Sequence, residues 1–77
     1  MKQLSIQILS VPHREKLIAE IQYNHYAIAE INYDYGYFQV EVFSYDNVQL
    51  MYSLDEFIDT LKKAKLELLE INNCDLN

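Results

Sequence analysis

Apolar and polar residues alternate along much of the first half of the chain. Residues 18–23 read IAEIQY, and the nearly identical IAEINY follows at 28–33. A third alternating segment, FQVEVF, occupies residues 38–43. Alternation with a period of two, rich in β-branched and aromatic residues, is typical of half-buried strands. The short spacers predict neighbouring antiparallel strands of a meander.

Similar patterns flank these segments, so that four to five strands are expected in total. They fall at about residues 3–9, 16–23, 27–33, 37–44 and 48–52. A helix is predicted at about 54–71, where apolar residues recur at three-and-four spacing and form one stripe. Its members are Leu54, Phe57, Ile58, Leu61, Ala64, Leu68 and Ile71. The predicted fold is a single α+β domain, residues 1–77, with the helix packed on one face of an antiparallel sheet.

The start of this helix carries the clearest local signal. Ser53-Leu54-Asp55-Glu56 has the form of a capping box. In such a box the Ser53 hydroxyl accepts a hydrogen bond from the Glu56 amide, and the Glu56 carboxylate reaches back to the Ser53 amide. Tyr52 and Phe57 occupy the positions of a hydrophobic staple, so we expect their rings to touch.

Matching side-chain sizes across the first hairpin predicts its register. Pairing Ile21 with Ala29 and Ala19 with Ile31 sets a large residue opposite a small one in both pairs, which favours close packing. A three-residue loop at 24–26 gives this register. A strict two-residue turn would shift one strand and expose its apolar residues, so we do not expect it.

These registers also bring glutamates together on the opposite face. Glu20 falls opposite Glu30, and a turn at Tyr35-Gly36, where glycine supplies a positive φ, sets Glu30 opposite Glu41. Like charges in such pairs destabilise a sheet by roughly 0.2–1 kcal/mol each. We expect the row to be exposed, with Ile18, Ile28 and several aromatic residues around it. An ordinary solvated face explains this pattern, and so does a docking surface for a basic partner. The candidate partner-binding residues are Glu20, Glu30, Glu41, Tyr26, Tyr37, Phe43 and Tyr45.

Composition favours a basic protein as the partner. The chain has 12 acidic and 6 basic residues and a formal net charge of −6. Recognition of phosphate backbones needs clustered Lys and Arg, so we expect no direct binding of nucleic acid. No apolar run is long enough for a membrane span or a signal peptide. The single Cys74 has no disulfide partner within the chain, and we expect a cytoplasmic location.

Catalytic and metal-binding motifs are not recognisable in the sequence. His13 and His25 lack a Cys or His partner at a metal-ligand spacing. Glu20 and Glu30, as carboxylates on an open sheet face, lack the water-excluding cleft that acid–base catalysis needs. Gly36 is the only glycine, so there is no phosphate-binding glycine loop. We therefore expect a binding protein without cofactor or metal rather than an enzyme.

Several segments resemble small bacterial immunity-type proteins, which neutralise toxins delivered between bacteria. They are residues 17–24, 29–32, 40–42, 54–58 and 63–65. The resemblance implies an inhibitory binding protein that occludes a basic toxin, such as a nuclease, through the acidic and aromatic surface. Two alternatives remain open. One is a phage-encoded acidic decoy that inhibits a host nucleic-acid-binding defence complex, and the other is a structural or adaptor module that homodimerises through an exposed strand edge.

Overall fold

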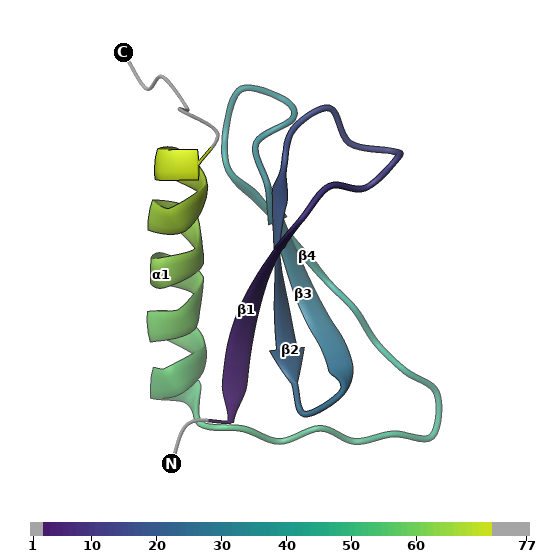
Figure 1. The fold of residues 1–77 in the computed structure, drawn as a ribbon. Coiled ribbons are helices and arrows are strands. Elements are labelled where there is room, and N and C mark those ends of the chain that lie inside the picture. Colours follow the sequence, from purple (N-terminus) through teal and green to yellow (C-terminus); the bar gives the residue numbers. More distant parts are fainter. Residues whose placement is uncertain (1–2, 72–77) are drawn as a thin grey trace.

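A computed structural model describes residues 3–71 of the chain. Its elements are β1 (Leu4–Leu9), β2 (Ile18–Tyr23), β3 (Tyr26–Asn32), β4 (Gln39–Val42) and α1 (Leu54–Ile71). The strands form one antiparallel sheet in the order β1-β2-β3-β4. Figure 1 shows α1 on one side of this sheet and the connection from β1 to β2 on the other. The predicted α+β fold, an antiparallel meander with a C-terminal helix on one face, is confirmed.

The fourth strand is shorter than predicted, and the prediction of a fifth strand is wrong. The Asn32 side chain ends β3, because its Oδ1 accepts a hydrogen bond from the Asp34 amide at 3.3 Å and turns the chain. Tyr33 and Phe38 therefore leave the ladder, although their rings still meet at 4.6 Å. Residues 48–52 form no strand. They run toward α1, and Leu50 and Tyr52 pack against the core, so side chains rather than a ladder hold them.

The first hairpin has the predicted register but not the predicted loop. Ile21 pairs with Ala29, as expected. The turn nevertheless has only two residues, Asn24-His25, with Asn24 at φ 55°. A bulge next to Ile21 adds one residue, Ile28, to β3 and restores the pairing. Excluding the two-residue turn was therefore wrong, because a bulge corrects the shift that a strict ladder would keep.

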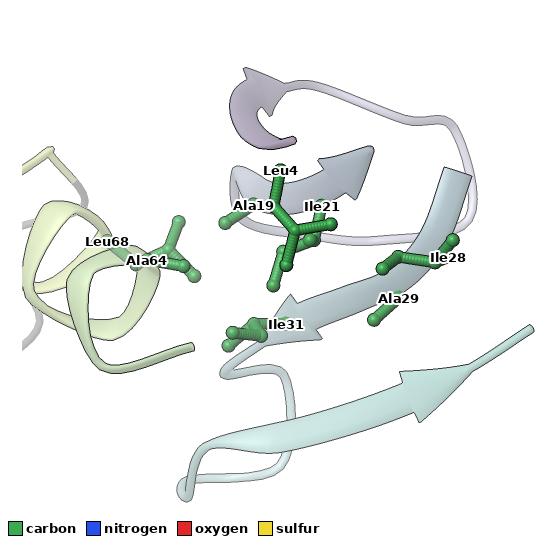
Figure 2. Close-up of a cluster of buried hydrophobic side chains, with 8 residues drawn as sticks. All are labelled: Leu4, Ala19, Ile21, Ile28, Ala29, Ile31, Ala64 and Leu68. Carbon is green, nitrogen blue, oxygen red and sulfur yellow. The ribbon is translucent and has the colours of Figure 1, made fainter. Parts of the chain in front are cut away.

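Ala64 and Leu68 of α1 close the core against the central strands (Figure 2). Both are fully buried, as are Ala19 and Ile21 of β2. Small residues on both elements allow the helix to approach the sheet closely, while the isoleucine and leucine side chains fill the space between them. The whole buried cluster consists of Leu4, Ala19, Ile21, Ile28, Ala29, Ile31, Ala64 and Leu68.

The buried stripe of α1 is rotated from its predicted position. Thr60 is buried between the turns of Phe57 and Ala64, whereas Leu54 and Ile71 are 70% and 50% exposed. The hydroxyl of Thr60 donates to the Glu56 carbonyl at 2.7 Å, so this polar group can be buried at little cost. α1 contacts β1, β2 and β3 but not β4, so the apolar side chains of β4 on this face are not covered by the helix.

The predicted hydrogen bond to the Ser53 side chain is confirmed, but the predicted return bond from the Glu56 side chain is wrong. Ser53 Oγ accepts from the Glu56 amide at 3.2 Å, and the rings of Tyr52 and Phe57 lie 5.4 Å apart. The Glu56 carboxylate does not return to Ser53. Its Oε2 accepts from the amides of Gln3 and Leu4 at 2.7 and 2.8 Å, and so fastens the start of α1 to the start of β1.

Candidate functional site

A row of polar side chains crosses the sheet on the face opposite α1. Gln7 pairs with Glu20, Glu20 with Glu30, and Glu30 with Glu41, so the predicted glutamate row is confirmed as a register. At the β1 end, the Gln22 amide donates to Gln7 Oε1 at 2.8 Å and to Glu20 Oε1 at 2.7 Å. Glu20 is therefore held by the neutral side-chain amide of Gln22 rather than by a cation.

Arg14 reaches the other end of the row from the β1–β2 connection. A turn directs it there, since the Arg14 amide donates to the Val11 carbonyl at 3.2 Å and Pro12 presets the backbone between them. Its Nε donates to Glu30 Oε2 at 2.8 Å. Its Nη1 lies 3.6 Å from Asp34 Oδ2, and its Nη2 lies 3.4 Å from Glu41 Oε1. We call Arg14 with Glu30, Asp34 and Glu41 the acidic cluster.

The prediction that the whole glutamate row is exposed is wrong for Glu30, because Arg14 covers it. Glu30 is only 5% exposed, while the Glu41 side chain remains 55% exposed. A cation of the same chain thus relieves the repulsion that the sequence suggested a partner would relieve. Burial lowers the pKa of Arg14, but the hydrogen bond and charge of Glu30 and the charges of Asp34 and Glu41 outweigh this, so the pKa is raised. The guanidinium remains charged at any pH at which the protein functions.

Asn32 and Asp34 extend the acidic cluster beyond the row. Asn32 is buried, and its Nδ2 lies 3.4 Å from Glu30 Oε2 as a donor. Asp34 is held at the end of β3 by the bond from its amide to Asn32 Oδ1. Its own Oδ1 is buried without a hydrogen-bond partner among the described residues. The cluster therefore has more acceptor capacity than the chain satisfies.

An open hollow of about 560 Å³ lies beside the acidic cluster at the β4 edge of the sheet. Its lining residues are Arg14, Asn32, Tyr35, Gln39, Val40 and Glu41. Three carboxylates surround one guanidinium here, so the cluster keeps a net negative charge. This arrangement favours a cationic group entering from solvent, and it places Glu41 where such a group arrives first.

Of the aromatic residues predicted for the same surface, only Tyr37 lies next to this hollow. The rings of Tyr26 and Tyr45 meet edge to face with 5.3 Å between their centroids, and the Tyr45 hydroxyl donates to the Ala27 carbonyl at 2.6 Å, so both hold the start of β3. Phe43 is half-buried. Tyr37 is exposed in the loop between β3 and β4, and its hydroxyl accepts a hydrogen bond at 2.9 Å from Nε2 of Gln39, which lines the hollow. The predicted residues therefore form separate groups rather than one patch.

Two isoleucines predicted to face outward are also buried. Ile18 is 1% exposed and Ile28 is 2% exposed. Ile28 is the extra residue of the bulge and joins the buried cluster, because the bulge changes the alternation of β3 at this point. The segment after β4 lies beside it, and Phe43, Leu50 and Tyr52 line a common hollow of about 270 Å³ with it.

Sequence reasoning missed Arg14, the residue that organises the acidic cluster. It lies in an irregular connection, where hydrophobic periodicity carries no information. A weak signal was present, since Arg14 is the only arginine in the sequence and the predicted row held three glutamates without a cation. Arginine is the side chain best suited to bind several carboxylates at once, because its donors point in fixed directions.

Other candidate chemistry receives no new support from the structure. Within residues 3–71, no group of three or more His, Cys, Asp or Glu side chains is placed to hold a metal ion. The described part of the chain also has no helix with the length and apolar character to cross a membrane. Cys74 lies outside the described residues.

Comparison of the chain with family models, with curated proteins and with solved structures gives no match in any of the three. The geometry of the acidic cluster is therefore the basis for a functional proposal.

Proposed function

We propose that this protein is a non-enzymatic inhibitory binding protein that occludes a basic protein. In this proposal it acts as an immunity protein, and its partner is a bacterial toxin such as a nuclease. The observation that supports the proposal is the unbalanced acidic cluster, in which three carboxylates meet one guanidinium beside an open hollow. The formal net charge of −6 adds a long-range field of the same sign.

The chemistry of a nuclease explains why such a cluster would inhibit it. A protein that binds phosphate backbones presents clustered Lys and Arg side chains. An acidic protein is attracted to that surface, associates quickly, and prevents nucleic acid from reaching it. Glu41 is exposed enough for direct contact, while the buried Glu30 and the half-buried Asp34 strengthen the negative potential behind it.

The test uses the product of the gene adjacent to the one that encodes this protein. That product is expressed in a bacterial host alone and together with this protein, and growth is measured. We expect the neighbour alone to arrest growth and coexpression to restore it. The purified proteins should form a complex whose affinity falls as salt rises, because charge pairs carry part of the binding.

A matched pair of variants connects this result to the acidic cluster. Glu41→Gln removes the exposed charge of the cluster, whereas Asp59→Asn makes the same charge change on an exposed position of α1. Glu41→Gln should slow association and flatten its salt dependence, and Asp59→Asn should have a smaller effect. Equal effects of the two variants, or toxicity that coexpression does not relieve, would contradict the proposal.

A further inference from the structure

The two edges of the sheet differ in how their backbone groups are used. At the β1 edge, Glu56 accepts from the amides of Gln3 and Leu4, and α1 packs alongside. At the β4 edge, the Phe43 amide donates to the Ile28 carbonyl, which fixes the phase of the ladder to β3. The alternation of an antiparallel ladder then points the amides and carbonyls of Val40 and Val42 away from the sheet.

These outward groups lie in an accessible strand. Within the described residues no backbone hydrogen bond reaches the amides or carbonyls of Val40 and Val42. Neither α1 nor another strand covers β4 on that side. Such an edge is a template for one more strand, because each new backbone hydrogen bond satisfies groups on both chains.

The side chains of β4 carry different chemistry on the two faces of the sheet. Val40 and Val42 are 51% and 64% exposed on the face of α1, since the helix stops short of β4. Val40 borders an apolar hollow of about 200 Å³ with Phe38 and Leu61. Glu41 points to the opposite face, where it belongs to the acidic cluster.

We propose that the β4 edge is a strand-addition site for an extended segment of a basic protein. The segment has an alternating apolar–basic–apolar sequence and pairs antiparallel with β4. Its apolar residues lie opposite Val40 and Val42, and its basic residue lies opposite Glu41 and enters the hollow beside the acidic cluster. This inference rests on the proposed function and specifies which part of the basic partner is bound.

The hydrogen-bonding pattern of β4 also brings a basic residue of the added strand close to Glu41. With the outward groups of Val40 and Val42 hydrogen-bonded to the new strand, Glu41 belongs to a non-hydrogen-bonded pair. Side chains are closest in such pairs, with Cα atoms about 4.5 Å apart. A Lys or Arg opposite Glu41 is therefore well placed to reach the carboxylates around Arg14.

A second copy of this chain is a poorer occupant of the same edge. The register that pairs both valines of one copy with both valines of the other sets Glu41 opposite Glu41. Like charges directly opposite destabilise the pair. Each copy also carries a net charge of −6, which adds repulsion over a longer range.

The test uses the capped peptide Lys-Thr-Val-Lys-Val-Thr-Lys, with binding followed by NMR at low salt. We expect the largest changes at the amides of Val40 and Val42, together with slower hydrogen exchange there. Glu41→Gln should weaken binding by about threefold to tenfold. Replacing the central lysine of the peptide by glutamate should abolish binding.

Two changes test the backbone pairing itself. Val42→Pro removes an outward amide but no hydrogen bond to β3, so an edge strand can accept it, and it should weaken binding at least about tenfold. N-methylation of the two peptide valines removes their donors without any change in the protein, and should have the same effect. Asp59→Asn is the charge control on α1.

The outcomes separate this inference from the proposed function. Binding that survives both Val42→Pro and N-methylation overturns strand addition but leaves an acidic surface that binds basic chains. No binding of the peptide, together with no complex in the coexpression test, overturns both. Sedimentation of the free protein as a dimer that Val42→Pro dissociates would show that a second copy occupies the edge, and would overturn the inference.

Discussion

The two faces of the sheet are closed in different ways, although the same alternation along the strands produces both. On one face, Ala64 and Leu68 of α1 cover aliphatic residues. On the other, a single arginine from a connection covers Glu30 and leaves Glu41 at the surface. The first face is held by apolar area, which is non-directional. The second depends on hydrogen-bonded ion pairs, whose value depends on geometry and on every charge being paired.

This difference indicates where binding energy is available. On the helix-covered face the apolar side chains of the core are buried. The exceptions are Val40 and Val42 of β4, which α1 does not reach. In the glutamate row of the other face only Glu30 is buried, and the charges there are incompletely neutralised, because the acidic cluster has more carboxylates than cations. The exposed valines of the first face and the excess carboxylates of the second both lie at β4. A partner there gains apolar contact and charge complementarity from one strand.

The largest expected effect belongs to the helix-covered face. Leu68→Ala should lower the free energy of unfolding by about 2–5 kcal/mol, because it removes a fully buried side chain and leaves a cavity. A domain this small has little stability in reserve. Denaturant unfolding measures the change. Leu66→Ala, at a position 61% exposed, is the matched control and should stay within about 0.5 kcal/mol.

The second effect tests whether ion pairs hold the other face. A row of unpaired glutamates predicts that Glu30→Gln stabilises the free protein by relieving repulsion. With Arg14 bound to Glu30 the expectation reverses, and the change should cost about 1–3 kcal/mol because Arg14 loses its closest charged partner. Glu20→Gln removes a carboxylate of the same row that is held by Gln22, and should cost less.

A double-mutant cycle sharpens this second result. Arg14→Gln should destabilise the protein by leaving Glu30 buried without its cation. Adding Glu30→Gln to that variant should then restore part of the loss, which measures the coupling between the two residues. A gain in stability in Glu30→Gln alone, or additive effects in the cycle, would show that the acidic cluster does not hold this face.

A third, smaller effect concerns the link between α1 and β1. Glu56→Ala should cost about 1–2 kcal/mol, because the Gln3 and Leu4 amides lose a charged acceptor at a partly buried position. Hydrogen exchange should become faster at the start of β1. If Glu56 acted only within the helix cap, the faster exchange would be confined to the first turn of α1.

The smallest effect is expected at the cap residue itself. Ser53→Ala should cost about 1 kcal/mol, since the Glu56 amide loses the Ser53 hydroxyl as its acceptor. Partner binding should remain unchanged, because the cap lies away from the β4 edge. A folded Ser53→Ala variant that no longer binds would place the interface at the start of α1. Thermal unfolding with a binding measurement on the same sample distinguishes these results.

The sequence by itself determined the order of the elements, the pairing of Ile21 with Ala29, and the start of α1 at Ser53. These features arise from local preferences and from a period of two along each strand, so they can be recognised in neighbouring residues. The same alternation placed Glu20, Glu30 and Glu41 in one row. It could not say whether that row was exposed.

Tertiary structure decided which segment covers each face of the sheet and which side chains are buried. Arg14 reaches Glu30 across 16 positions of sequence, through a connection without periodicity, so no local pattern places it there. The rotation of α1 toward Thr60 and the burial of Ile28 at the bulge depend in the same way on how the elements meet. Periodicity assigns residues to faces, but only packing between distant segments determines which face stays open to a partner.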